Sequence, residues 1–200
     1  MCFLLSKGLV LKIYNFDRAF SVFLFDTNDK LLLQQRSIHK ITYPNHWTNT
    51  CCSHPLYEED EITNENNHVG IKRAAKRRLN YELGIQESQL NLKSLEFLTR
   101  IKYQASNVPN DGIFGENEID YVIFLRGNYT LQPNHNEVKA VKYVSIYELK
   151  ELLEEEKNLN SGVLLTPWFK LICERFLFKW WSNLNNLKEF QDFKAIHNLS

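Results

Sequence analysis

The sequence predicts an α+β protein in which helices flank one mixed or mostly antiparallel sheet. Strand-like and helix-like segments are interleaved in mixed order, and the apolar and charged fractions are ordinary for a globular core. The length of 200 residues suits one domain, which would bury roughly 70% of its unfolded surface without a disulfide or metal. We expect this domain to span residues 17–200, preceded by an atypical segment at 1–16.

The first half of the chain predicts a hairpin, a loop and a helix. Apolar runs at 19–25 and 31–36 flank the turn-forming residues DTND, which favours an antiparallel hairpin. Residues 56–67 are acidic and polar, so we expect a surface loop there. Residues 69–83 have helical periodicity, and this helix is expected to stop at Gly84.

The second half predicts three more strands and two helices. Segments 95–103 and 118–126 are strand-like and are joined by a stretch rich in Asn, Pro and Gly, and residues 138–146 predict a further strand. Ser145 and Glu148 form a capping box ahead of the helical sequence ELKELLEEE. Thr166 and Pro167 then open a long aromatic-rich helix, because proline suits the first helical position.

Charge and cysteine content restrict the class of partner. The formal net charge is zero, which argues against a general nucleic-acid binder. The four cysteines match neither a disulfide framework nor a zinc knuckle, so we expect reduced thiols in a cytosolic setting. The N-terminal residues lack the features of a signal peptide, and no run reaches the ~18 apolar residues of a membrane span. We expect a cytoplasmic monomer that binds neither nucleic acid nor membrane.

The helix at 69–83 carries two charged residues in the middle of its apolar face. Steps of ~100° per residue place five apolar side chains on that face: Ile71, Ala74, Ala75, Leu79 and Leu83. Arg78 and Glu82 fall among them, and a charged pair pointed at a core is costly unless it is paired or serves a site. A structural ion pair is one interpretation. We prefer the other, in which Glu82 faces a metal or phosphate pocket.

Alternation along two extended segments gathers groups that can move a proton. In CCSHP, Cys52 and His54 point the same way, and in GENEID the side chains of Glu116, Glu118 and Asp120 share one face. Taken singly, these residues are typical of a buried thiol, a structural histidine and a solvated strand edge. On one sheet, a thiol, an imidazole and carboxylates can hold a divalent cation and transfer a proton.

Two cations, Arg36 and Lys40, lie in the segment RSIHKITYP after a core strand. Exposed loop cations are usually only solubilising. These follow the strand that would form a pocket floor, so anion binding is expected.

Several segments together resemble the type I isopentenyl-diphosphate isomerases in their animal form: AFSVFLF, LLLQQRS, TNTCCSHP, RRLNYELG, GENEIDY, and TPWFKL with FLFKWW. The resemblance runs from about Asp17 to about Phe190, with the motifs in family order. TNTCCSHP and GENEIDY are specific to that family. The resemblance implies a Nudix fold and the interconversion of isopentenyl and dimethylallyl diphosphate through a tertiary carbocation.

The resemblance also implies roles for individual residues. Cys52 and Glu118 match the acid–base pair of the family. Tyr103 matches a tyrosine that assists the glutamate, and Trp168 matches a tryptophan whose ring faces the cation. Contacts to the diphosphate are implied for four residues: Arg36, Lys40, Ser53 and Arg78.

Two metals are implied. Glu82, with the Cys52 backbone, matches the site of a magnesium ion bound with the diphosphate. A second metal, zinc or manganese, is held in the family by three histidines and two glutamates, of which three positions are kept: His54, Glu116 and Glu118. Asp17 stands where one histidine is expected and is a candidate oxygen ligand. The segment upstream offers no second histidine, although Lys7 and Lys12 are candidates for a diphosphate-binding lysine.

The two missing histidines leave alternative interpretations of the chain. Three interpretations are open: the N-terminus is mispredicted or truncated, the chain is a weaker but active enzyme, or it is an inactive relative kept to bind diphosphate. A Nudix pyrophosphate hydrolase is disfavoured, because the Nudix box keeps only five of its residues: Arg77, Leu79, Glu82, Gly84 and Ile85. Asn45 replaces a loop glycine of the family, and asparagine is the side chain that best tolerates a positive φ.

Overall fold

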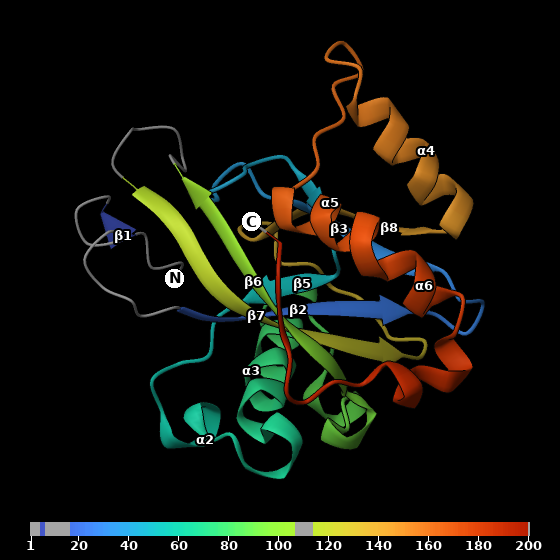
Figure 1. The fold of residues 1–200 in the computed structure, drawn as a ribbon. Helices are drawn as coiled ribbons and strands as arrows, with labels where there is room; N and C mark the ends of the chain where they lie inside the picture. Colours follow the sequence, from blue (N-terminus) through green and yellow to red (C-terminus); the bar gives the residue numbers. More distant parts are fainter. Residues whose placement is uncertain (1–4, 7–16, 107–113, 200) are drawn as a thin grey trace.

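A mixed sheet lies at the centre of the computed structural model, which describes residues 5–6, 17–106 and 114–199 (Figure 1). Its main path runs β4-β3-β2-β7-β6-β9, while β1 pairs with β7, β5 with β2 and β8 with β3. The strands described are β1 (Leu5–Ser6), β2 (Asp17–Phe25), β3 (Leu31–Arg36), β4 (Trp47–Thr48), β5 (Cys51–Ser53), β6 (Glu96–Ser106), β7 (Phe114–Arg126), β8 (Val138–Val144) and β9 (Ile196–Asn198). The β2–β7 and β6–β9 pairs are parallel and the other pairs antiparallel, so the α+β prediction with a mixed sheet is confirmed.

Helices cover both faces of this sheet. The α-helices described are α2 (Glu59–Ile62), α3 (Glu65–Leu83), α4 (Ile146–Glu156), α5 (Pro167–Ile172) and α6 (Phe178–Trp181). Short 3-10 turns are η1 (Glu87–Gln89), η2 (Leu92–Ser94) and η4 (Leu184–Phe190), and a π-helical segment, η3 (Cys173–Leu177), joins α5 to α6. Figure 1 shows α3 on one face of the sheet, α5 and α6 on the other, and α4 beside them.

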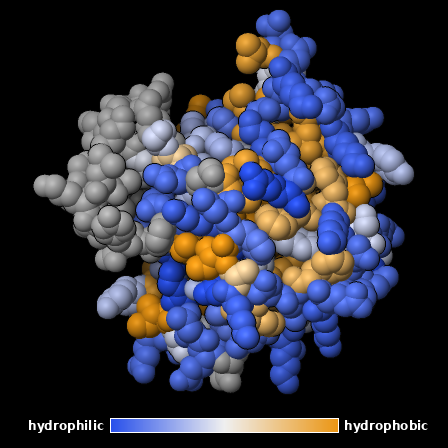
Figure 2. All heavy atoms as spheres, in the orientation of Figure 1, coloured by the Kyte–Doolittle hydropathy of each residue, from blue (hydrophilic) through white to orange (hydrophobic). Residues whose placement is uncertain are grey.

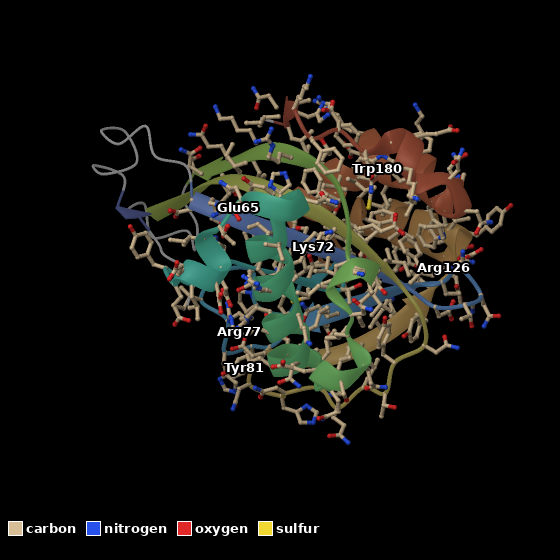
Figure 3. The ribbon with its side chains drawn as sticks, turned by 90° about the horizontal axis from the view of Figure 1, so that it is seen from below. Glu65, Lys72, Arg77, Tyr81, Arg126 and Trp180 are labelled. Carbon is tan, nitrogen blue, oxygen red and sulfur yellow. The ribbon has the colours of Figure 1, made fainter. Side chains whose placement is uncertain are left out.

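The alternating side chains of β2 serve two cores. Phe20 and Leu24 belong to the cluster that includes Leu79 of α3, while Phe23 and Phe25 belong to the cluster of the C-terminal helices. Figure 3 shows the same division, with Lys72, Arg77 and Tyr81 along α3 and Trp180 on the far side of the sheet. Burying a large apolar side chain contributes ~1.5–3 kcal/mol, so β2 is stabilised from both faces.

Most predicted elements are confirmed. Phe25 pairs with Leu31 in the expected hairpin, and Gly84 ends α3 with a φ of 66°. Ser145 and Glu148 form both bonds of the capping box. Pro167 opens α5, which continues through η3 to Trp181.

The surface loop predicted for residues 56–67 is wrong in part. Residues Glu59–Ile62 form α2, and α3 already begins at Glu65. Glu61 is buried because Arg77 pairs with its Oε1 at 2.6 Å and the Leu56 N–H donates to its Oε2 at 2.7 Å. The acidic composition predicted exposure to solvent, but the ion pair between Glu61 and Arg77 holds this segment against α3.

The surface seen in Figure 2 is mostly polar, with apolar residues exposed in patches between charged ones. Within the described residues, no helix combines the length and the apolar character that crossing a bilayer requires. The predictions made for Lys7 and Lys12 lie outside the described residues.

Candidate active site

A cavity of about 220 Å³ lies where β2, β5, β6 and β7 meet the loop after β3 and the start of α5. Of the twelve predicted site residues, ten line it: Arg36, Lys40, Cys52, Ser53, His54, Arg78, Tyr103, Glu116, Glu118 and Trp168. Asp17 and Glu82 are not among the lining residues. The volume is below the roughly 300–1,000 Å³ of pockets for drug-sized molecules, so the cavity suits a small ligand.

Strand register explains why residues distant in the sequence meet here. On one edge of β2, Ser21 pairs with Cys52 of β5, and on the other edge Asp17 pairs with Glu118 of β7. Across the next ladder Tyr103 of β6 is the direct partner of Glu118. The two sets of side chains predicted from CCSHP and GENEID therefore reach one cavity, which Ser53, between Cys52 and His54, also lines.

Cys52 presents a neutral thiol. Burial raises its pKa to about 12, against the opposing effect of the Arg36 guanidinium, whose Nη1 lies 3.9 Å from Sγ. The thiol therefore holds its proton at neutral pH. The adjacent Cys51 is fully buried in the apolar core with α3, and its pKa is also raised by burial.

The carboxylates of β7 form the acidic end of the cavity: Glu116, Glu118 and Asp120. Burial, followed by repulsion from Glu118, raises the pKa of Glu116 to about 8. Burial also raises the pKa of Asp120 to about 7, although the Ser21 hydroxyl donates to its Oδ2 at 2.8 Å. Oε2 of Glu116 and Oδ1 of Asp120 are buried without a hydrogen-bond partner. Near neutral pH these two groups therefore favour holding a proton unless a cation binds beside them.

His54 and Asp17 stand beside these carboxylates. Nε2 of His54 lies 2.8 Å from Oε1 of Glu118. Burial alone would lower the pKa of His54, but Glu118 and then Asp17 more than reverse this, and the pKa is raised. Burial raises the pKa of Asp17. The charge of His54 acts to lower this pKa, and the charge of Glu118 acts to raise it. Asp17 is thus close to the pair without lining the cavity.

Aromatic rings close another wall. The Trp168 indole N–H donates to Oδ1 of Asn49 at 3.1 Å, which fixes the plane of the ring. Tyr103 contacts Trp168 edge to face, with ring centroids 6.0 Å apart, and its hydroxyl lies 3.4 Å from that of Tyr43. The guanidinium of Arg36 lies 5.6 Å from the centre of the indole, so this ring already faces a positive charge.

Arg36 holds the loop that covers the cavity. It is the last residue of β3, it is buried, and its Nη2 donates to the Thr42 carbonyl at 2.7 Å. Its Nε lies 3.1 Å from the carbonyl of Tyr43. Asn45 in the same loop has a φ of 62°, which confirms that this position needs the left-handed region. Arg36 therefore has a structural function besides any contact to a ligand.

Arg78 and Glu82 are buried in the middle of the inner face of α3, as predicted, and they form an i,i+4 ion pair. Gln34 donates to the other oxygen of Glu82 at 3.0 Å. Burial would raise the pKa of Glu82, but Arg78 and Lys40 lower it, so the group is ionised. Only Arg78 of the pair reaches the cavity. A metal at Glu82 stays a prediction.

A model of the NUDIX domain matches residues 15–166 of the chain. The Mus musculus protein named isopentenyl-diphosphate Delta-isomerase 1 is 55% identical over 195 residues, which are 98% of this chain and 81% of that protein. The chain belongs to the isopentenyl-diphosphate Delta-isomerase family. The isomerase of Schizosaccharomyces pombe is 48% identical, over 94% of this chain and 77% of that protein.

The fold of this isomerase family member is similar to those of solved structures from other organisms. A NUDIX hydrolase from Alicyclobacillus acidocaldarius matches with a TM-score of 0.55 at 8% identity, over 80% of this chain and 90% of that chain. A MutT NUDIX hydrolase from Burkholderia pseudomallei matches with a TM-score of 0.53 at 14% identity, over 82% and 99%. These likenesses show a shared Nudix fold. Enzymes with this fold generally use divalent metals.

The isomerase cavity fits a divalent cation in the chemistry of its donors. Buried carboxylate oxygens without partners, on Glu116 and Asp120, favour an incoming positive charge. His54 adds an imidazole, which currently bonds to Glu118. Within the described residues no three His, Cys, Asp or Glu side chains are already arranged as a metal site. Binding would therefore require the His54–Glu118 pair to adjust.

Two acidic residues that line the cavity, Asp120 and Glu137, were absent from the predicted site. Asp120 lies on the face predicted for GENEID, and its burial, which the sequence does not show, marks it as part of the cavity wall. Glu137 comes from the turn before β8, whose sequence NHNEV is typical of a solvated turn. The tertiary fold, and not a local sequence pattern, brings Glu137 to Lys40 and Arg78.

Proposed function

We propose that this chain interconverts isopentenyl and dimethylallyl diphosphate by adding a proton to one carbon and removing a proton from another. One observation carries the proposal: one small cavity is lined by a thiol whose pKa is raised by burial, a carboxylate network, an indole ring and three cationic side chains. Relatives named isopentenyl-diphosphate isomerase, at 47–55% identity, support the same reaction.

Cys52 and Glu118 act as the acid–base pair. Transfer of a proton to the carbon–carbon double bond leaves a tertiary carbocation, and loss of a proton from the neighbouring carbon forms the isomer. One proton is added to the substrate and one is removed, so no net proton is consumed, and the proton gained by the acceptor must return to the donor before the next turnover. Support comes from the raised pKa of the Cys52 thiol, which keeps a proton available, and from the bond of Glu118 to His54. Tyr103, the strand partner of Glu118, assists the carboxylate.

Trp168 stabilises the carbocation through its ring face. The bond from its indole N–H to Asn49 and the edge contact with Tyr103 hold the ring, so little reorganisation is needed when charge develops. A cation over a desolvated indole is stabilised by ~2 kcal/mol or more. The same rings exclude water, which would otherwise trap the cation.

The diphosphate binds at the cationic end of the cavity, through Lys40, Arg78 and the hydroxyl of Ser53. Arg36 contributes through Nη1, because its other nitrogens are used by the loop at Thr42 and Tyr43. Small anions recognised by lysine and arginine are held by charge-assisted hydrogen bonds.

We expect Mg²⁺ to bind with the diphosphate near Glu82 and the Cys52 backbone. Zinc or manganese would be held by His54, Glu116 and Glu118, with Asp17 as a further oxygen donor close by. Bound there, the second cation would supply the positive charge that these carboxylates lack. The unpartnered oxygen of Glu116 supports this assignment.

The direct test is an isomerase assay with Mg²⁺ and either Zn²⁺ or Mn²⁺. Cys52→Ala and Glu118→Gln are each expected to lower kcat by about 10²–10⁴-fold, the usual contribution of a positioned acid or base. Cys51→Ala is the matched control, because Cys51 is the adjacent thiol but is enclosed in the core. Variants at 52 and 118 as active as the parent would show that the roles are wrongly assigned. Release of phosphate from nucleoside diphosphate derivatives would indicate a hydrolase instead.

A further inference from the structure

Four charged side chains form a closed ring at the cationic end of the cavity. Lys40 and Arg78 supply the positive charges, and Glu82 and Glu137 the negative ones. Glu137 Oε2 pairs with Lys40 Nζ and lies 3.2 Å from Arg78 Nη2. Glu82 Oε1 pairs with the same Arg78 nitrogen and lies 3.9 Å from Lys40 Nζ. The ring is therefore electrically neutral, although both of its cations are expected to bind the diphosphate.

The two carboxylates of this ring differ in their surroundings. The side chain of Glu82 is 1% exposed and also accepts a bond from Gln34. The side chain of Glu137 is 18% exposed and lines the cavity. Removing the partners of Glu82 would leave a buried charge uncompensated, which is costly, whereas Glu137 can turn to solvent. Glu137 is thus the anion that an incoming phosphate group can replace.

The backbone keeps Glu137 close to its two cations. Its carbonyl accepts from the Ser37 N–H at 2.9 Å, and its own N–H donates to the Asn134 carbonyl at 2.9 Å. Asn134 in turn donates to the Glu82 carbonyl at 2.9 Å, which ties the turn to the end of α3. The carboxylate consequently stays near the bound ligand after its ion pairs have opened, and it repels any net negative charge there.

We propose that Glu137 is a specificity-determining residue that makes diphosphate binding depend on a divalent cation. Its carboxylate occupies the cation contacts that a phosphate group needs, so metal-free diphosphate meets both a competitor and a like charge. A diphosphate–metal complex carries less negative charge and suffers less repulsion. The inference rests on the proposed function, since it assumes that a diphosphate is the ligand of this end of the cavity.

The test compares Glu137→Gln with the parent in titration calorimetry with inorganic pyrophosphate, once in EDTA and once in saturating Mg²⁺. Glutamine has the same shape and still accepts a bond from Arg78 or Lys40, so the substitution removes mainly the charge. In EDTA the variant should bind pyrophosphate about tenfold more tightly than the parent. In Mg²⁺ the two dissociation constants should agree within about threefold.

Two further variants separate charge from structure. Glu156→Gln is the matched control: Glu156 pairs with Lys170 at 2.7 Å, its side chain is 19% exposed, and it lies outside this cavity. It should leave both dissociation constants unchanged. Glu137→Asp keeps the charge and should keep the preference of the parent for pyrophosphate in Mg²⁺. Equal thermal midpoints for the parent and Glu137→Gln would show that both are folded.

Two results would overturn the inference. Unchanged or weaker binding of pyrophosphate to Glu137→Gln in EDTA would mean that the carboxylate only positions the cations. Loss of the Mg²⁺ effect without a gain in EDTA would make Glu137 a metal ligand. The isomerase assay on the same preparations keeps the proposals distinct. Tighter pyrophosphate binding without any isomerase activity of the parent would contradict the proposed reaction alone.

Discussion

The two ends of the cavity differ in how completely their buried charged groups are paired. At the acidic end, Glu116 and Asp120 each keep an oxygen without a partner, and burial raises the pKa of both. At the cationic end, Lys40 and Arg78 are matched one for one by Glu82 and Glu137. The acidic end is stabilised when it accepts a proton or a metal ion. The cationic end must release one of its carboxylate partners before it can bind an anion.

Because of this difference, the two ends affect the free energy of unfolding in different ways. Burial penalises a charge that has no partner, so the acidic end reduces the stability of the free protein. A fully paired network leaves no buried charge uncompensated, but removal of one member is strongly destabilising. The comparison can be tested at each end, and the cationic end should respond more strongly.

The largest effect is expected when the paired end loses Arg78. Arg78→Met leaves Glu82 buried without its main partner, and the free energy of unfolding in urea should fall by about 3–5 kcal/mol. The double variant Arg78→Met/Glu82→Leu removes both charges and should recover most of that loss. A double variant no more stable than the single one would show that the ring is held together by something other than charge pairing.

The next effect is expected from a metal at the acidic end. Mn²⁺ at about 100 times its dissociation constant should raise the free energy of unfolding by about 2.7 kcal/mol, measured by thermal unfolding against an EDTA reference. Glu116→Gln should lose most of this gain, and Glu156→Gln, a residue that does not line the cavity, should retain it. Equal stabilisation of Glu116→Gln and the parent would place the bound metal elsewhere.

The smallest effect concerns pH in the absence of divalent cations. The pKa values of Glu116 and Asp120 are about 8 and about 7 in the folded protein, above their ordinary values of 4.5 and 3.8. Both groups therefore stabilise the fold while protonated, and this stability is lost as pH rises through those folded pKa values. Between about pH 5 and pH 8 in EDTA, the thermal midpoint should fall by several degrees, and Glu116→Gln should show a shallower fall. A midpoint that rises over this range would contradict the raised pKa values.

Local patterns in the sequence predicted much of the fold and most of the cavity lining. Alternation was sufficient for Cys52, His54 and the carboxylates of β7, because side chains on one face of a strand reach one place. Helical periodicity was sufficient for the burial of Arg78 and Glu82. In both cases the signal lies within a few neighbouring residues.

What could not be predicted depends on contacts between distant parts of the chain. Glu137 reaches the cavity because Gln132 and Asn134 bond to the backbone at the end of α3, and no local pattern encodes those bonds. The helical turn Glu59–Ile62 depends in the same way on the pairing of Glu61 with Arg77. Sequence alone favoured a functional Arg78–Glu82 pair over a structural one without a pattern that separates the two, since the residues are the same in both cases.

Strand β2 has a consequence for how this family can vary. It supplies few of the assigned groups, yet it is hydrogen-bonded on one edge to the strand of Cys52 and on the other to the strand of Glu118. Cys52 and Glu118, the proposed acid–base pair, are thus spaced by the hydrogen-bonded strands and not by the length of any loop. Insertions in the surrounding turns can accumulate without disturbing the chemistry, but a single residue gained or lost within β2 would turn one partner to the wrong face.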